Sequence, residues 1–430
     1  MTGPLEDVVV VAIEQAVAGP FATRHLADLG ARVIKIERVG EGDFARHYDD
    51  SLGSGYSSWF VWLNRSKESV ALDVKSERGR RTLHRLVRHA DVFLHNLAPG
   101  AVDRLGCSVT ELQAMNPRLV SCAISGYGPD GPYRDRKAYD LLIQAEAGLV
   151  SLTGTPEHLA KAGLSVADIA GGMYAYSGVL AALVRRGVTG KGSHVEVALF
   201  DCLLEWLSHQ LTITKMLGQV PRRAGASHAT IAPYGPYRCR DGQDVLVAVQ
   251  NADEWRRLCE AIGLPALADD QRFATNADRV RASADLDAVL GARTAKLASE
   301  ELIGRLEAAE LAWAGINDMF AVLRHEHLAA RGRWIDVETP GGVYQTLRSP
   351  IEIGGAEPMV GPVPALGQHT DEVLAWLDDL ERATAPTGDG GDGQADPVAS
   401  QAGRSDENAT REGWGPSRGG GRREKRSRLA

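Results

Sequence analysis

Asp168 is the acidic residue whose surroundings most suggest chemistry. It stands in the segment GLSVADIAGG at 163–172, where its neighbours are apolar or small and two glycines follow it. A carboxylate in such a segment either caps the N-terminus of a helix or is positioned for a reaction. The residues alone leave both interpretations open.

Basic side chains follow several of the predicted strands. They are Arg38, Arg46, Lys75, Arg104 and Lys137. At the carboxyl edge of a parallel sheet such side chains are candidates for binding an anion, although each one alone also fits a solvated surface position. The pattern therefore predicts an anion-binding edge only if the fold brings these positions together.

Several common catalytic motifs do not occur in the sequence. The first predicted strand is followed by Ala18-Gly19-Pro20 in place of GxGxxG, so NAD binding is not expected even though Glu37 ends the second strand. The GxSxG, HExxH and Walker motifs are missing, and the 12 histidines show no metal-ligand spacing. A hydrolase triad and a metal centre are therefore disfavoured.

The elements that must position these residues alternate between strands and helices. The pattern predicts strands at 8–13, 33–37, 70–74, 91–97, 119–125 and 194–200, and helices that open at Gly19-Pro20 or cover 77–90 and 167–185. Continuous apolar runs are typical of strands buried on both faces. Alternation at the length of a βαβ unit predicts an α/β fold with a Rossmann-like, mostly parallel sheet.

The composition along the chain predicts its domain organisation. Residues 1–215 are expected to form the N-terminal part of a large α/β domain, 225–325 a smaller inserted α+β domain, and 330–382 a return to the large domain. Residues 383–430 are rich in glycine and charge and poor in large aliphatic side chains. They predict a disordered, low-complexity tail.

The overall composition is that of a globular protein. The chain has 430 residues and a net charge of -8, which argues against nucleic acid as a partner. Its 5 cysteines form no CxxC pair, and each is expected to be a small buried apolar residue in a reducing compartment. The N-terminus lacks the features of a signal peptide, and no run of about 20 apolar residues appears, so we expect a cytoplasmic protein without a membrane span.

In their order and spacing, several segments resemble the class III CoA transferases. This family includes formyl-CoA:oxalate and carnitine CoA transferases and also α-methylacyl-CoA racemases. The resemblance covers about residues 7–375. It rests on AGPFATRHLADLGARVIKIERVGEGDFAR at 18–46, LDVK at 72–75, HNLAPGAVDRLG at 95–106, SGYGPDGPY at 125–133, RKAYDLLIQAEAG at 136–148, ADIAGG at 167–172, GKGSHVEVALFD at 190–201, TIAPYG at 230–235 and PALGQHT at 364–370.

The resemblance implies a role for Asp168 as the nucleophile that attacks an acyl-CoA thioester and then carries CoA itself as a thioester. It also implies that CoA is a substrate, that no cofactor is needed, and that two chains form an interlocked homodimer. The residues it assigns to CoA binding are Val17, Ala18, Arg38, Leu72, Lys75, Asn96, Leu97, Ala101, Arg104, Lys137 and Tyr139.

Departures from the family pattern bear on the substrate. Val17 stands where formyl-CoA transferase has Gln, and Gly225-Ala226-Ser227-His228 stands where that enzyme has a GGGGQ loop. The stretch around His228 is more similar to members that act on small dicarboxylic acids such as mesaconate, itaconate, citramalate, malate or succinate. The alternative activity is that of a racemase, but Tyr139-Asp140 replaces the His-Asp pair of that branch, so one of the two bases for proton transfer is missing.

Overall fold

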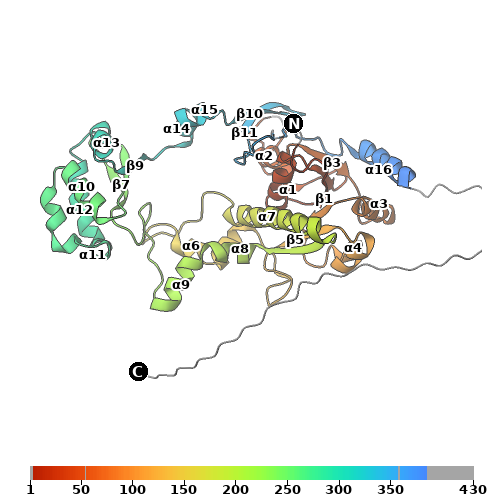
Figure 1. The fold of residues 1–430 in the computed structure, drawn as a ribbon, viewed down its shortest axis with the longest axis horizontal. Coiled ribbons are helices and arrows are strands. Elements are labelled where there is room, and N and C mark those ends of the chain that lie inside the picture. Colours follow the sequence, from red (N-terminus) through yellow and green to blue (C-terminus); the bar gives the residue numbers. More distant parts are fainter. Residues whose placement is uncertain (1–2, 54, 357–358, 385–430) are drawn as a thin grey trace, which may run out of the picture. The chain divides into compact units, whose positions relative to one another are not determined.

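The computed structural model describes residues 3–53, 55–356 and 359–384, and its centre is a 6-stranded parallel sheet with the order β3-β2-β1-β4-β5-β6 (Figure 1). The strands are β1 (Val9–Ile13), β2 (Arg32–Glu37), β3 (Lys67–Ala71), β4 (Val92–His95), β5 (Val120–Ser125) and β6 (Ser193–Ala198). Each pair of neighbours is parallel, so that Val10 lies beside Val33 of β2 and Val92 of β4. The predicted α/β fold is confirmed.

Helices cover both faces of this sheet, as a parallel sheet requires. On one face, α1 (Ala18–Asp28), α7 (Val166–Thr189) and α8 (Leu199–Trp206) share a core with Val10 and its neighbours. On the other face, α3 (Glu77–Arg88), α4 (Val109–Met115) and α16 (Thr370–Thr384) pack against Val11 and its neighbours. Successive strand residues therefore face opposite cores, which explains why the strands read as uninterrupted apolar runs.

Shorter elements connect these layers. They are η1 (Phe44–His47), α2 (Ser58–Asn64), η2 (Asp103–Leu105), α5 (Asp140–Glu146), α6 (Leu149–Leu152) and α9 (Ser208–Leu217). Local capping sets several helix starts: the Ser76 hydroxyl accepts a hydrogen bond from Gly79 N–H at α3, and Ser108 and Glu111 form a capping box at α4.

A second sheet has its own hydrophobic core. It is a 3-stranded antiparallel sheet of β7 (Tyr234–Arg238), β8 (Asp244–Ala248) and β9 (Ala312–Gly315). Its core includes Val245, Trp255 and Leu302 and does not draw on the six-stranded sheet. The helices between β8 and β9 are α10 (Ala252–Ala261), η3 (Pro265–Asp269), η4 (Gln271–Phe273), α11 (Asn276–Arg281), α12 (Ser283–Thr294) and α13 (Ser299–Ala308).

The remaining elements lead back to α16. After β9 come α14 (Met319–Leu323), α15 (Glu326–Ala330) and the antiparallel pair β10 (Trp334–Thr339) and β11 (Gly342–Leu347). The division into domains at 1–215, 225–325 and 330–382 remains a prediction. Of the predicted tail at 383–430, the first two residues end α16 and the rest lies outside the described residues.

Two expected strands are shifted. The strand predicted at 70–74 is β3, which begins at Lys67. Its first residues include the polar Lys67 and Ser69, whose side chains are buried because they bind buried carboxylates. A pattern of apolar residues therefore misses the start of this strand. The strand predicted at 194–200 ends at Ala198, because α8 begins at Leu199.

The cysteines and the long helix α7 were the subject of two expectations from the sequence, a set of buried thiols and the absence of a membrane span. All 5 cysteines are buried and free, as expected. Although no membrane span was predicted, α7 is apolar and long enough to cross a membrane, with a mean hydropathy of 1.3 over its most apolar window. Many of its apolar side chains, such as Ala170, Tyr176 and Val179, however, join the core beside α1 and the sheet, whereas Val184 and Val188 are exposed.

Candidate active site

The residues expected to bind CoA all follow carboxyl ends of the central strands. Val17 and Ala18 follow β1, Arg38 follows β2, Leu72 and Lys75 follow β3, Asn96, Leu97, Ala101 and Arg104 follow β4, and Lys137 and Tyr139 follow β5. Because the strands are parallel, these ends share one edge of the sheet. The strand order reverses between β1 and β4, and α/β proteins bind ligands at such a switch point.

Three cations at this edge remain available for a ligand. The side chains of Lys75, Arg104 and Lys137 are exposed and have no ion-pair or hydrogen-bond partner among the residues that the structure describes. Arg38 is more constrained, because its guanidinium stacks on Phe44 with 4.2 Å to the ring centroid and donates to Gln15 at 3.3 Å. The edge thus offers unpaired positive charge to an anionic group.

Two of the residues singled out from the sequence are engaged with other parts of the chain. Arg46 was a candidate for binding an anion, but it is buried and forms a bidentate ion pair with Glu37 at 2.7 and 2.8 Å. The Asn96 amide is also engaged: it donates to Gln15 O at 2.8 Å and accepts from Gln15 N–H at 2.9 Å. Asn96 therefore holds the loop after β1, at the switch point.

A buried ionic network lies beneath these loops, and no sequence pattern had indicated it. Lys35 binds Asp43 at 2.7 Å, and Lys67 binds Glu14 at 2.7 Å, with all four side chains fully buried. Asp43 also accepts from the N–H groups of Ala16 and Ala45 at 2.9 Å. Burial alone would raise the pKa of Glu14, but Lys67 and Lys35 outweigh it and lower that pKa. The network ties the loops after β1 and β2 to the sheet.

Asp168 lies in the first turn of α7, partly buried. It is not the helix cap, so that interpretation is wrong: the N-cap residue is Ser165, and the capping acceptor is the Asp140 carboxylate. Burial, with a smaller contribution from the charge of Asp140, raises the pKa of Asp168 to about 7. Within the described part of the chain, no donor forms a hydrogen bond with the Asp168 carboxylate. The group is an unpaired carboxylate with raised basicity.

Other groups near Asp168 come from separate loops. Burial raises the pKa of Tyr48, and Asp43, Asp168 and Tyr139 contribute to that shift. The charges of these groups reach Tyr48, so the residue that follows η1 lies in the same region as the start of α5 and the start of α7. The Tyr139 ring, predicted to contact CoA, is 70% exposed there.

Glycines let α7 approach its neighbours closely. A Cβ atom on Gly172 would lie 2.8 Å from Ala18 O and 3.0 Å from the Phe21 ring, and one on Gly171 would lie 2.2 Å from Leu199. Both positions serve packing. They bring α7, and with it Asp168, against the start of α1 that carries Val17 and Ala18.

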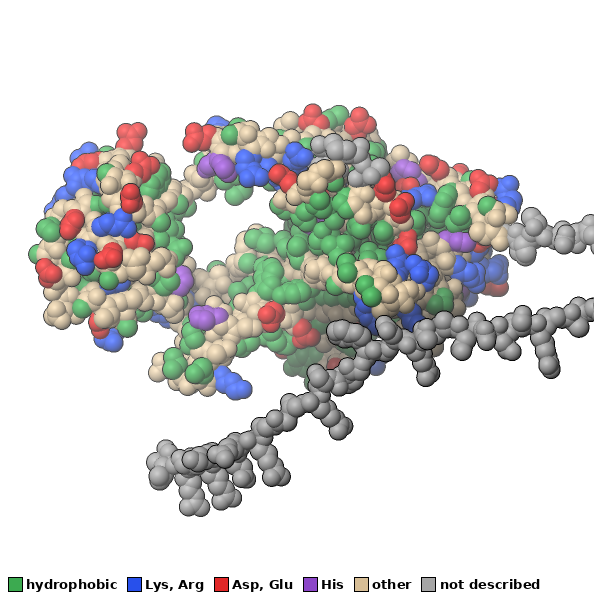
Figure 2. Space-filling model, viewed as in Figure 1, with side chains coloured by type: hydrophobic (Ala, Val, Ile, Leu, Met, Phe, Trp, Pro, Cys, Tyr) green, Lys and Arg blue, Asp and Glu red, His purple; other side chains and the backbone are tan. Residues whose placement is uncertain are grey.

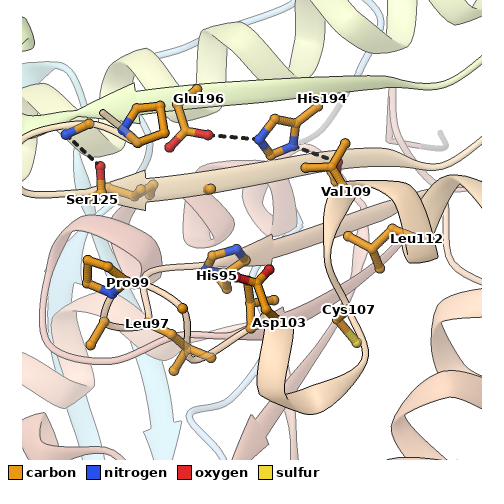
Figure 3. Close-up of a pocket in the computed structure, with 18 of the residues that line it drawn as sticks. His95, Leu97, Pro99, Asp103, Cys107, Val109, Leu112, Ser125, His194 and Glu196 are labelled. Atoms are coloured by element: carbon orange, nitrogen blue, oxygen red, sulfur yellow. Dashed lines mark hydrogen bonds and ion pairs between the residues drawn. The ribbon is translucent and has the colours of Figure 1, made fainter. Parts of the chain in front are cut away.

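A cavity opens beside the loop after β4, and Asp168 does not line it. Leu97, Pro99 and Asp103 lie on one side with His95 of β4, and Ser125 of β5 lies on the other side with His194 and Glu196 of β6 (Figure 3). There the Ser121 hydroxyl lies 2.8 Å from Nδ1 of His194, whose Nε2 lies 2.8 Å from Glu196.

The hydrogen-bonded residues Ser121, His194 and Glu196 do not form a catalytic triad. Ser121, the second residue of β5, is 5% exposed and lies opposite His194 of β6 in the sheet. Burial lowers the pKa of His95 to about 4, so this ring is uncharged at neutral pH. These hydrogen bonds satisfy polar groups on the sheet.

Two further observations concern metal binding and the surroundings of His228. Among the described residues, no group of 3 or more His, Cys, Asp or Glu side chains is arranged to hold a metal ion. The His228 ring stacks on Tyr234 with 5.3 Å between centroids, and its Nδ1 accepts from Thr230 N–H at 3.2 Å. These contacts support a structural role for His228.

Comparisons with known proteins find similar sequences and a similar fold. The profile of CoA-transferase family III matches residues 5–370. Succinate–glutarate CoA-transferase of Agrobacterium fabrum is 35% identical, over 89% of this chain and 98% of its own length. Acetyl-CoA:oxalate CoA-transferase of Acetobacter aceti is 35% identical, over 82% and 90% of the two chains. A CAIB/BAIF family protein from Brucella suis superposes with a TM-score of 0.77 at 36% identity, over 88% of this chain and all of that one.

Proposed function

This chain belongs to CoA-transferase family III, and on that premise we propose that it moves CoA between dicarboxylic acids through covalent adducts on Asp168. The observation that carries the proposal is the carboxylate itself. Asp168 is unpaired, partly buried and raised in pKa to about 7, and it lies in the helix that packs against the start of α1. A carboxylate is a weak nucleophile in water, but a fixed and desolvated one gains reactivity.

The first half of the reaction forms a thioester on the protein. One oxygen of Asp168 attacks the thioester carbonyl of the donor, the C–S bond breaks, and an aspartyl–acyl anhydride and CoA thiolate result. The thiolate then attacks the aspartyl carbonyl of the anhydride. The donor acid leaves as a carboxylate, and CoA remains bound to Asp168 as a thioester.

The second half repeats these steps with the acceptor. Its carboxylate attacks the aspartyl thioester and releases CoA thiolate, which then attacks the acceptor carbonyl of the new anhydride. Asp168 is regenerated as a carboxylate, and the energy of one thioester bond is kept throughout. Water must be kept from the anhydride. Partial burial of Asp168 suits that need.

The edge of the sheet supports the binding of CoA. Its phosphates need cations, and Lys75, Arg104 and Lys137 are exposed there without partners in the described residues. Val17, Ala18 and Leu72 would contact the less polar parts of the molecule. We propose no further cofactor, because every step uses only Asp168, CoA and two acids.

The nature of the acids follows from the relatives. Their names specify succinate with glutarate, acetyl-CoA with oxalate, and succinyl-CoA with D-citramalate. We infer that this chain also takes small dicarboxylic acids, in keeping with the similarity around His228, that it works in the cytoplasm, and that it does so as a homodimer.

A trapping experiment tests the proposal. The purified full-length chain is incubated with succinyl-CoA and quenched with hydroxylamine, and intact and peptide masses are measured. We expect a hydroxamate on Asp168, no adduct in Asp168→Ala, and an unchanged adduct in Asp7→Asn, an exposed acid near the N-terminus. Glutarate, oxalate or citramalate added before the quench should instead discharge the aspartyl thioester, yield the matching CoA thioester and lower the amount of hydroxamate. If a panel of acyl-CoA thioesters left Asp168 unmodified while α-protons exchanged with deuterated solvent, the racemase activity would replace the transferase.

A further inference from the structure

The first turn of α7 is capped by a residue from another helix. The carboxylate of Asp140, the first residue of α5, accepts hydrogen bonds from the backbone N–H groups of Ala167 at 2.8 Å and Asp168 at 3.4 Å. The local N-cap, Ser165, makes no side-chain bond of this kind. Free N–H groups at a helix start need such an acceptor. The backbone that carries Asp168 is thus held by Asp140.

Asp140 is in turn held by Gln144, one turn later on α5. The fully buried Gln144 amide donates to the second oxygen of Asp140 at 2.7 Å and to Leu164 O at 3.4 Å. Its own oxygen accepts from Ala162 N–H at 3.0 Å. Gln144 therefore fixes both the Asp140 carboxylate and the segment 162–164 that leads into α7.

Asp140 acts on Asp168 through its charge as well as through its hydrogen bonds. After burial, Asp140 is the second cause that raises the pKa of Asp168 to about 7. The other titratable groups close by are Tyr48 and, through it, Asp43 and Tyr139. Asp43 is paired with Lys35 at 2.7 Å. Asp140 is therefore the negative charge that acts most directly on the Asp168 carboxylate.

We propose that Asp140, kept in place by Gln144, is a positioning residue for the reaction on Asp168, and that its charge favours the uncharged acylated forms of Asp168 over the free carboxylate. This inference rests on the proposed function. Acylation removes the charge of Asp168 while Asp140 keeps its own, so repulsion present in the free enzyme is relieved in the anhydride and the thioester. The same repulsion makes the free carboxylate more basic and a better nucleophile.

Substitutions can separate the cap from the charge. Asn keeps one capping oxygen for Ala167 N–H, so Asp140→Asn should keep α7 in place while it removes the charge and the oxygen that accepts from Gln144, whereas Asp140→Ala removes the cap as well. The hydrogen bond to Gln144 is also lost in Gln144→Leu, so comparing the two variants isolates the charge. Gln144→Leu keeps the charge but releases its orientation. The matched control is Glu146→Gln, which removes a carboxylate from the same helix that pairs with Arg136 at 3.2 Å.

The pH dependence of kcat/KM is the first readout. Asp168 must be ionised to attack, so activity should fall as the pH drops through its pKa. In Asp140→Asn that acidic limb should move to lower pH, and the trapped adduct at pH 8 should decrease by roughly 3- to 10-fold. Gln144→Leu should lower kcat with little change in KM for the CoA donor, and Glu146→Gln should match the unmodified chain. An acidic limb and adduct fraction unchanged in Asp140→Asn would overturn the inference.

A second readout does not need a substrate. Carbodiimide with an amine labels protonated carboxyl groups, and peptide mass spectrometry reports the pH midpoint for Asp168 alone. That midpoint should lie near pH 7 in the unmodified chain and lower in Asp140→Asn. If the unmodified chain formed no adduct but the midpoint still moved, the proposed function would fail while the electrostatic coupling stood. An unmoved midpoint would reject the coupling whatever the activity.

Discussion

At the scale of single residues, the balance of forces on Asp168 is unusual. An acid in the first turn of a helix is normally stabilised as a carboxylate by the helix dipole, which lowers its pKa. Here the pKa rises to about 7, because burial and then Asp140 act in the opposite direction and outweigh the dipole. The neighbouring residues in the sequence showed that Asp168 lies among small and apolar side chains. They could not show Asp140, which is 28 positions away and close only in the fold.

This balance predicts a dependence of stability on pH. A carboxyl with a pKa raised from 3.8 to about 7 binds its proton in the folded state and loses it when the chain unfolds, so its contribution to stability is present at low pH and lost as the pH rises through about 7. Asp168→Asn removes the costly charge. We expect the variant to be more stable than the unmodified chain at pH 8 by about 1–2 kcal/mol, well under the full shift because the group is partly exposed, with little difference at pH 4.

Denaturant unfolding at several pH values between 4 and 8 measures this difference. Asp7→Asn, at an exposed site, serves as the control and should show no such trend. A gap between Asp168→Asn and the unmodified chain that is the same at pH 4 and pH 8 would contradict the raised pKa.

At the scale of elements, sequence patterns were sufficient where burial is uniform. The apolar runs and their spacing predicted the parallel sheet and α7, because buried strands and long helices have strong local signals. The patterns failed where polar residues are buried by distant partners. Because Lys67 and Ser69 are polar, the start of β3 was missed. The sequence suggested that Arg46 is an exposed cation, but it is buried in an ion pair with Glu37. The pairing of α5 with the start of α7 is also non-local, so only the folded chain reveals it.

The contact between α7 and α1 gives a prediction at this scale. Gly172→Ala should destabilise the chain by about 1–3 kcal/mol and reduce kcat, because its Cβ would lie 2.8 Å from the backbone oxygen of Ala18 and push α7 away. Gly187→Ala is the matched control on the same helix, where a Cβ would meet nothing within 4 Å. That change should stabilise by up to about 1 kcal/mol through helix propensity. Thermal unfolding and steady-state kinetics check both, and equal effects would rule out the close approach.

At the scale of the whole molecule, the helices α9 and α14 carry several apolar side chains that are exposed on the surface (Figure 2). No residue of α9 is buried, and Met216 and Leu217 are 78% and 66% exposed. On α14, Met319 and Phe320 are 74% and 67% exposed. Isolated apolar side chains on a surface are ordinary, but helices that expose several of them usually meet another chain. These surfaces suit the homodimer proposed above.

Light scattering after gel filtration tests that assembly. We expect the full chain to elute with twice its mass of 46.1 kDa. The double change Met216→Lys and Leu217→Lys should shift it toward the monomer and lower activity, whereas Val188→Lys, at an exposed apolar position near the end of α7, should not. A monomeric unmodified chain at micromolar concentration would refute the homodimer.

The buried cysteines have a practical consequence. The proposed reaction forms a CoA thiolate in every cycle, and a reactive protein thiol nearby would exchange with CoA disulfides. Cys107, Cys122, Cys202, Cys239 and Cys259 are all buried, and burial raises the pKa of each thiol. Thiols in this state are poor nucleophiles. The protein should therefore tolerate oxidised CoA, and a chromogenic disulfide reagent can report CoA that is lost to hydrolysis without inactivating the catalyst.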